Sequence, residues 1–253
     1  MSFAQDDLTH DAFLGGKLRL WQPRAGYRAG VDPVLLAACV PAVPGQTVLE
    51  LGCGAGAAAL CLAARVPGLA LTGIEMQPEY SDLARQNAVE NGAALEVITT
   101  DLTALPMGVR QTSYDHVIAN PPYYREGAHT LALNAGRRMA LGEQTPLSDW
   151  VEVAAKRLAP KGYLHLIQRV DRLPELLVAC SGRLGSLEVL PLAARPGRSP
   201  DLVILRARKN GRAAFILHAP VILHKGAEHM ADGDSYTVEI AQILREGAAL
   251  NWP

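Results

Sequence analysis

Apolar runs of strand length alternate with helical patterns through the middle of the chain. Seven apolar runs bounded by turn residues predict buried strands: Thr47–Leu51, Leu69–Ile74, Leu95–Thr99, Asp115–Ala119, Tyr163–Gln168, Leu187–Leu192 and Leu202–Ala207. Four segments between them predict helices: Ala57–Arg65, Glu79–Asn91, Leu147–Leu158 and Arg172–Ser181. This alternation predicts an α/β fold, with a mostly parallel seven-stranded sheet and helices on both faces.

Shorter elements flank this core on both sides. Before it, Leu18–Gln22 alternates like a strand, and Pro33–Val40 predicts a short helix with Asp32 as its N-cap. After it, Phe215–Leu223 predicts a strand or hairpin, and Val238–Glu246 a closing helix. We therefore expect one domain over residues 1–253, made of an N-terminal extension (1–46), an α/β core (47–210) and a C-terminal hairpin and helix (211–253).

Turn residues mark several boundaries. Asn91-Gly92 is a good C-terminal stop for the helix before it, and Pro160–Gly162 predicts a tight turn into the fifth strand. The longest stretch without a clear pattern is Tyr123–Pro146. A loop of that length in a compact domain is usually functional or disordered.

Composition limits the class of protein. The chain is 49% hydrophobic and 19% charged, which excludes a wholly disordered protein. Its net charge of −1 neither favours nor excludes a nucleic-acid partner, so only local charge bears on that question. No apolar stretch has the length of a membrane helix, and Met1–His10 lacks the pattern of a signal peptide. We expect a cytoplasmic protein that contacts no membrane.

Residues that could bind a metal are scattered. The cysteines have no CxxC spacing and predict reduced core thiols: Cys39, Cys53, Cys61 and Cys180. A second group matches no zinc pattern, is interrupted by a proline, and is interpreted as part of the predicted hairpin: His218, His224, His229 and Asp232. We therefore expect no metal.

A glycine turn follows the first core strand. Gly52, Gly54 and Gly56 form a GxGxG pattern, and the acidic residue Glu50 precedes it. Glycines allow a ligand to approach the backbone, and the N-terminus of the following helix adds oriented N–H groups. Because glycine punctuates many strand–helix turns, this pattern alone is weak.

Two further acidic residues end the next two strands. Glu75 is placed to accept the hydroxyl groups of a ribose, and Asp101 lies at the level of an adenine amino group. The alternatives are a solvated strand end for Glu75 and an N-cap for Asp101. Since ligands of open parallel sheets bind at the carboxyl ends of the strands, the combination predicts a nucleotide-like cofactor.

This set resembles the motifs of class I S-adenosylmethionine methyltransferases, which implies a Rossmann-like fold and S-adenosyl-L-methionine as cofactor. A nicotinamide dehydrogenase is the competing use of such a fold, and the segment after the fourth strand argues against it. The resemblance and the pattern together give these cofactor-binding candidates: Tyr27, Arg28, Asp32, Glu50, Gly52, Cys53, Gly54, Gly56, Glu75, Met76, Asp101, Leu102 and Asn120.

The fourth strand ends in Asn120-Pro121-Pro122-Tyr123. Two prolines fix two backbone angles and supply carbonyls but no N–H groups, which suits a substrate that donates hydrogen bonds. If the Asn120 side-chain oxygen and the Pro121 carbonyl each accept one amino hydrogen, the delocalised lone pair of a planar amine turns toward the methyl donor. Tyr123 supplies a face on which a base can stack.

Asparagine and proline are also common in plain loops, so position decides the interpretation. At the end of the fourth strand, the tetrapeptide resembles the fourth motif of amino-methyltransferases that act on adenine N6, cytosine N4 or protein glutamine. The catalytic candidates are therefore Asn120, Pro121, Pro122 and Tyr123.

The segment Gln22–Leu36 bears on the substrate. It resembles the motif ahead of the catalytic domain in bacterial methyltransferases that modify adenine N6 next to the anticodon (position 37) of a valine tRNA. The resemblance is strongest from Gln22 to Tyr124, and the tail from Ala219 departs from it. Release-factor glutamine methyltransferases carry a helical domain for which we find no room. We expect N6-methylation of a tRNA adenine.

Local charge favours an RNA partner. The segment from Arg183 to Arg212 contains seven basic residues and two acidic ones. Arginines on loops can bind phosphates, although a solvated face or a lid without RNA contact is an alternative. The RNA-binding candidates are arginines of two predicted loops, one directly after the fourth strand and one between the last two strands: Arg125, Arg137, Arg138, Arg195 and Arg198.

Three other functions stay open. They are methylation of release-factor glutamine N5, methylation of an amino group in ribosomal RNA, and RNA binding without catalysis beside a relict cofactor site. The expected partner is tRNA, and the expected state is a monomer or weak homodimer.

Overall fold

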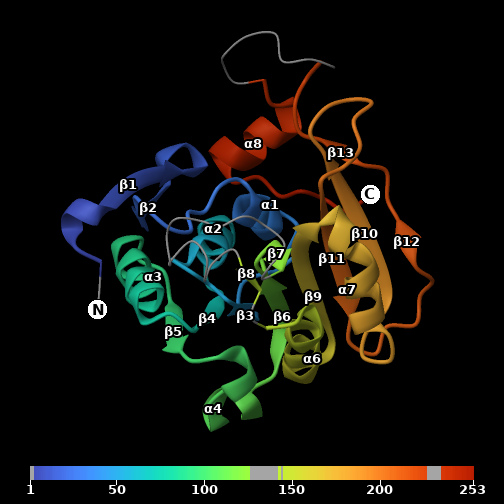
Figure 1. Cartoon of the computed structure of the whole chain (residues 1–253), viewed down its shortest axis with the longest axis horizontal. Coiled ribbons are helices and arrows are strands. Elements are labelled where there is room, and N and C mark those ends of the chain that lie inside the picture. The colour runs from blue at the N-terminus through green and yellow to red at the C-terminus, as the bar shows by residue number, and fades with distance from the viewer. Residues whose placement is uncertain (1–2, 126–141, 144, 227–234) are drawn as a thin grey trace.

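The computed structural model describes residues 3–125, 142–143, 145–226 and 235–253. Its main sheet contains all seven predicted strands, with ends shifted by a few residues (Figure 1). These are β3 (Thr47–Leu51), β4 (Ala70–Glu75), β5 (Leu95–Thr99), β6 (Tyr114–Ala119), β9 (Leu158–Arg169), β10 (Gly185–Ala193) and β11 (Leu202–Arg208).

The strand order is β5-β4-β3-β6-β9-β11-β10, and the first five strands are parallel. β11 lies antiparallel between β9 and β10. The carboxyl ends of β3, β4, β5, β6 and β9 therefore lie at one side of the sheet, which we call the carboxyl edge. The predicted fold class, α/β with a mostly parallel sheet, is confirmed.

Helices cover both faces of the sheet. One core lies under α1 (Asp32–Ala38), α2 (Ala57–Arg65) and α8 (Val238–Glu246), with α3 (Pro78–Glu90) beside it. The other lies under α4 (Met107–Gln111), α6 (Leu147–Arg157) and α7 (Leu173–Cys180).

Neighbouring residues of one strand pack into opposite cores, as Val117 and Ile118 of β6 do. Burial on both faces is the reason that these strands appear as continuous apolar runs. All four cysteines are buried thiols.

The N-terminal extension contains a hairpin of β1 (Leu8–Phe13) and β2 (Leu18–Pro23). Its outer edge is bound by side chains of α3. Asn87 accepts a hydrogen bond from Trp21 N at 2.8 Å and donates one to Trp21 O at 3.1 Å. Asn91 makes the same pair of bonds to Arg19. These amides take the place of a neighbouring strand along β2, whose Leu18 and Leu20 side chains are buried in the core.

The C-terminal hairpin is the main error of the sequence-based fold. Segments β12 (Ile216–Leu217) and β13 (Val221–Ile222) both pair parallel with β10, one after the other, and not with each other. They extend the main sheet beyond seven strands. Pro220, which lacks an N–H group, lies between them. The closing helix α8 is confirmed at its predicted bounds, with Thr237 as N-cap.

Two local predictions are also wrong. The N-cap of α1 is Val31, and Asp32 is the first residue of the helix, where its carboxylate binds another side chain, described below, instead of capping. Pro160–Gly162 is no turn between elements but a register shift inside the continuous strand β9, with Lys161 at φ 70°. The predicted helix stop at Asn91 is confirmed.

Two short strands, β7 (Tyr124–Arg125) and β8 (Gly142–Glu143), pair in parallel beyond β6. Most of the predicted loop Tyr123–Pro146 lies outside the described residues. Among the residues that the structure describes, no helix combines the length and apolarity needed to cross a membrane.

Candidate functional site

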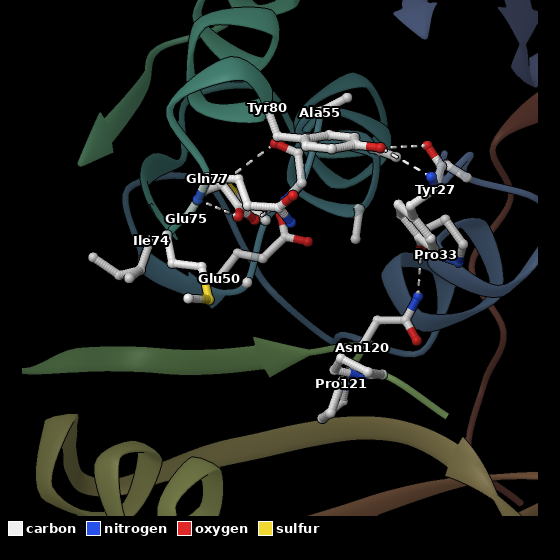
Figure 2. Close-up of a pocket in the computed structure, with 18 of the residues that line it drawn as sticks. Tyr27, Pro33, Glu50, Ala55, Ile74, Glu75, Gln77, Tyr80, Asn120 and Pro121 are labelled. Carbon is white, nitrogen blue, oxygen red and sulfur yellow. Dashed lines mark hydrogen bonds between the residues drawn. The ribbon is translucent and has the colours of Figure 1, made fainter. Parts of the chain in front are cut away.

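A cavity lies at the carboxyl edge between the N-terminal extension, the ends of β3 to β6 and α6 (Figure 2). It brings together nearly all the predicted cofactor and catalytic residues. Its lining includes Tyr27, Arg28, Asp32, Glu50, Gly52, Cys53, Gly54, Glu75, Met76, Asp101, Leu102, Asn120, Pro121, Pro122 and Tyr123. Of the predicted set, Gly56 does not reach the lining and instead precedes α2 as its N-cap.

The glycine turn has a conformation that other residues rarely adopt. Gly52, Gly54 and Gly56 have φ values of 65°, 53° and 86°. A Cβ atom on Gly52 would also lie 2.6 Å from the ring of Trp150. The glycines are therefore required by the backbone and by packing, in addition to leaving room for a ligand.

Glu50 lies at the inner end of the cavity. Its carboxyl group is 3% exposed and accepts a hydrogen bond from Ala59 N, in the first turn of α2, at 2.9 Å. Burial raises the pKa of Glu50 to about 8, against the opposing effect of that hydrogen bond, and the charge of Glu75 adds to the rise. A cationic ligand group placed beside it would favour its ionised form.

Glu75 binds the glycine turn directly. Its two carboxylate oxygens accept hydrogen bonds from Gly54 N at 2.9 Å and Gln77 N at 2.8 Å (Figure 2). Burial raises its pKa, and these backbone N–H groups oppose the rise. Each carboxylate oxygen has a second lone pair, so Glu75 can still accept hydrogen bonds from ligand hydroxyl groups.

Asp101 is the N-cap of a short 3₁₀ helix, Leu102–Ala104. Its Oδ1 atom accepts from both the N–H and the hydroxyl of Thr103 at 2.7 Å. The alternative interpretation of this residue as an N-cap is thus confirmed. Asp101 also lines the cavity together with Leu102, so the capping role and a ligand contact are compatible.

The residues after β6, Asn120–Tyr123, form what we call the catalytic corner. Asn120 Nδ2 donates to the Tyr27 hydroxyl at 3.3 Å. Asn120 Oδ1 is buried and accepts no hydrogen bond in the described structure. A buried acceptor without a partner is costly, by about 1–3 kcal/mol, and such groups are rare. It therefore indicates a missing donor, such as a substrate amine.

The rest of the corner is held by two further side chains. Gln168 Nε2, at the end of β9, donates to the carbonyls of Pro122 at 3.2 Å and Pro121 at 3.4 Å. The Tyr123 hydroxyl donates to Asp32 Oδ2, in the first turn of α1, at 2.7 Å. Burial raises the pKa of Tyr123, and Asp32 raises it further, so the hydroxyl keeps its proton.

Sequence analysis missed several residues that shape the site. Gln168 lies in a predicted strand, and its local sequence gives it no site role, although a fully buried glutamine in an apolar strand indicates a required hydrogen-bond partner. Tyr80 accepts from Tyr27 N at 2.9 Å and donates to Tyr27 O at 3.1 Å. Asn87 donates to Ala55 O at 2.9 Å and thereby joins the hairpin to the glycine turn.

Three predicted cofactor-binding residues, Arg28, Cys53 and Met76, line the cavity but also have contacts or exposure that the sequence did not predict. Arg28 is exposed and pairs with Asp11 at 2.7 Å, which stabilises the hairpin. Burial raises the pKa of the Cys53 thiol, which therefore stays protonated. Met76 is 46% exposed at the rim of the cavity.

Of the arginine candidates for RNA binding, the structure describes the side chains of Arg195 and Arg198. Arg195 donates to Lys225 O at 2.6 Å and to the Ser235 hydroxyl at 3.3 Å, so it joins two chain segments. Arg198 is exposed on the loop between β10 and β11. Arg137 and Arg138 lie outside the described residues, as does the side chain of Arg125.

Within the described part of the chain, no group of three or more His, Cys, Asp or Glu residues is placed to hold a metal ion. His218 pairs with Glu188 at 3.0 Å, and His224 bonds to Ser235. His229 and Asp232 lie outside the described residues.

Solved structures share this architecture. A predicted O-methyltransferase from Agrobacterium tumefaciens has a TM-score of 0.71 and 28% identity, over 87% of this chain and 99% of that one. A T. thermophilus 16S rRNA N2 G1207 methyltransferase, solved with AdoMet and guanosine, has a TM-score of 0.56 and 23% identity, over 80% of this chain and 50% of that one. The fold is that of the Rossmann-like class I methyltransferases.

The sequence profile of the methyltransferase small domain family matches residues 29–179. This match covers more than half of the chain and includes the glycine turn and the catalytic corner. The chain belongs to this family and is a methyltransferase.

Curated relatives cover most of the chain. One from Porphyromonas gingivalis is 30% identical over 77% of this chain and 79% of its own length. One from Shewanella halifaxensis is 31% identical over 72% and 74%. One from Actinobacillus succinogenes is 25% identical over 88% and 91%. All three are named tRNA1(Val) (adenine(37)-N6)-methyltransferase.

Proposed function

We propose that this protein transfers a methyl group from S-adenosyl-L-methionine to the exocyclic N6 of an adenine in tRNA, at position 37 of a valine tRNA. The observation that carries the chemistry is the buried, unpartnered Oδ1 atom of Asn120 in the cavity of a methyltransferase fold. The shared name of the relatives supports the choice of substrate.

The cavity fits the cofactor. Glycines without side chains leave the turn after β3 open, and carboxyl groups line the cavity on the same side. We assign Glu75 to the ribose hydroxyls, Asp101 to the adenine and Glu50 to the cationic methionine portion. When bound, S-adenosyl-L-methionine supplies an electrophilic methyl group on a sulfonium sulfur.

The residues of the catalytic corner prepare the amine. Asn120 Oδ1 accepts one hydrogen of the adenine amino group, and the Pro121 carbonyl accepts the other. Both acceptors are fixed before substrate binds, because Gln168 binds the proline carbonyls and Tyr27 binds the Asn120 amide. Positioning and preorganised electrostatics then lower the barrier.

The Tyr123 ring stacks on the base, and its hydrogen bond to Asp32 fixes the ring. The amino nitrogen would form its bond to the methyl carbon as the bond between that carbon and the sulfonium sulfur breaks, with S-adenosylhomocysteine as the neutral leaving group. The nitrogen is then cationic and gives a proton to water readily. A strong general base is therefore unnecessary.

We assign Arg125, Arg137, Arg138, Arg195 and Arg198 to the RNA backbone. Arg198 is supported by its exposure on a loop at the carboxyl edge, beyond the end of β10. We further propose that the protein acts in the cytoplasm as a monomer or weak homodimer.

Labelling with a tritiated methyl donor tests this function. The protein is incubated with a valine tRNA transcript bearing A37, the same transcript bearing G37, ribosomal RNA and release factors. We expect label only in the A37 transcript. Label in a release factor or in ribosomal RNA would overturn the substrate assignment.

The same assay tests the corner. Asn120→Ala is expected to lower transfer by at least ~100-fold, as loss of a preorganised polar contact does in other enzymes, while leaving the cofactor Kd within about threefold. Asn251→Ala, an exposed asparagine near the C-terminus, is the matched control and should keep full activity.

A further inference from the structure

Asn120 can work only if its amide has the correct end toward the substrate. The oxygen and nitrogen ends of the amide have nearly the same shape, but only the oxygen accepts a hydrogen bond. With the amide reversed, its NH2 group would face the substrate NH2 group, donor against donor. Some neighbouring group must therefore select one orientation.

The group in contact with the amide is the hydroxyl of Tyr27. It accepts from Asn120 Nδ2 at 3.3 Å, which leaves Oδ1 as the buried acceptor without a partner (Figure 2). We infer that Tyr27 is a positioning residue for methyl transfer, whose hydroxyl fixes the orientation of the Asn120 amide. This inference rests on the proposed function of the site.

The surroundings of Tyr27 favour the accepting role. Burial raises the pKa of its hydroxyl, and Asp32, Glu50 and Glu75 add to the rise. The hydroxyl therefore keeps its proton, and its oxygen still has lone pairs that can accept a hydrogen bond. One of them accepts from Asn120 Nδ2.

The backbone of Tyr27 is fixed as well. Tyr80, on α3, binds both its N–H and its carbonyl, at 2.9 and 3.1 Å (Figure 2). The Tyr27 ring also lies against the glycine turn, since a Cβ atom on Gly54 would be 3.7 Å from its Cε1 atom. A residue of the N-terminal extension thus completes the catalytic corner of the core.

The first test is Tyr27→Phe, which removes only the hydroxyl. We expect kcat for tRNA methylation to fall about tenfold, the size of one hydrogen bond of about 1.4 kcal/mol, because the hydroxyl no longer holds the Asn120 amide in the orientation that methyl transfer requires. The KM for tRNA and the Kd for the cofactor should stay within about twofold. The matched control is Tyr163→Phe, in the middle of β9 and outside the cavity lining, which should keep its kcat. An unchanged kcat in Tyr27→Phe would overturn the inference.

The second test removes the need for orientation. In Asn120→Asp, either oxygen of the carboxylate can accept, so Tyr27→Phe should cause less than a twofold further loss in that background. A merely structural role of Tyr27 would give the same loss in both backgrounds and would contradict the inference.

The third test does not depend on activity. The side-chain NH2 signals of Asn120 are identified by NMR through their loss in Asn120→Asp. They should shift in Tyr27→Phe and stay in place in Tyr163→Phe. If the wild-type protein labels no tRNA but the signals shift as expected, the proposed substrate fails and the positioning role stands. If the signals do not shift, the positioning role fails.

Discussion

At the scale of single residues, the cofactor side of the cavity depends on carboxyl groups kept away from water. Glu50 and Glu75 are 3% and 6% exposed, and burial raises the pKa of both. Backbone N–H groups of the glycine turn and α2 oppose that rise. These carboxyl groups should therefore ionise more easily when a cationic ligand group lies beside them.

Glu50 gives this effect a measurable pH dependence. Its pKa is about 8 in the folded protein against an ordinary 4.5, so between these values the folded state binds a proton that the unfolded state has lost. Stability of the cofactor-free protein should therefore fall as pH rises from ~4.5 to ~8. Glu50→Gln mimics the protonated form and removes this slope.

Thermal denaturation checks the prediction. The Tm of Glu50→Gln minus that of the wild type should increase by at least ~3 °C between pH 4.5 and pH 8. Glu96→Gln, on the exposed side of β5, is the control and should show no such trend. A constant difference for Glu50→Gln would contradict the assigned environment.

The sequence predicts some site residues and not others for a simple reason. Glu50, Glu75 and Asn120 lie in or directly after buried strands, so local pattern places them at the carboxyl edge. Tyr80 and Gln168 act through partners 53 and 46 residues away. Their roles depend on tertiary contacts, which one sequence does not reveal.

At the scale of elements, the link between the hairpin and α3 is the contact most directly connected to the cofactor site. Asn87 is fully buried and binds both β2 and Ala55 in the glycine turn. Asn91, one turn later, binds only β2 and its own helix, near solvent. One residue therefore couples the hairpin to the site, and the other only attaches it.

Alanine substitutions should separate these two roles. Asn87→Ala leaves buried backbone groups of Trp21 and Ala55 without partners, at a cost of about 2–4 kcal/mol, and should weaken cofactor binding severalfold. Asn91→Ala should cost about 1 kcal/mol or less and leave the cofactor Kd unchanged. Chemical denaturation and calorimetry measure both effects. Equal losses of cofactor affinity in the two variants would count against this coupling.

The sequence predicts the strands that are buried on both faces of the sheet, and it fails for strands whose pairing is irregular. The strands of the core are apolar on both faces, so their positions follow from the sequence alone. β1 is mostly polar and pairs with β2, whose other edge is bound by asparagines of α3. The segments around Pro220 depend on the free side of β10, which is set by the fold as a whole.

At the scale of the whole molecule, the cavity lies between the N-terminal extension and the core. Tyr27 and Pro33 of the extension line one side of the cavity, and Glu75 and Asn120 of the core line other parts of it (Figure 2). A ligand that fills the cavity contacts both parts. Its binding should therefore stabilise the extension as well as the core.

Cofactor binding should raise the stability by ~2.7 kcal/mol at a concentration of 100 times its Kd, or roughly 5–10 °C in Tm. Amide hydrogen exchange should slow in residues 18–36 as well as 50–56. Helix α7 packs on the face of the sheet opposite α1 and α2, and its residues are far along the chain from those of the cavity. Its amide exchange should therefore not change. Protection confined to 50–56 would show that the extension does not contact the cofactor.

The antiparallel position of β11 has a consequence for synthesis. β11 leaves the ribosome after β10 but lies between β10 and β9 in the sheet. Until Leu202–Arg208 has emerged, one edge of β9 has no neighbouring strand, and such an edge is prone to wrong pairing. This strand also carries Gln168, which binds the proline carbonyls of the catalytic corner. The nascent chain therefore completes its central sheet late in synthesis. Truncated chains that end before residue 202 should aggregate.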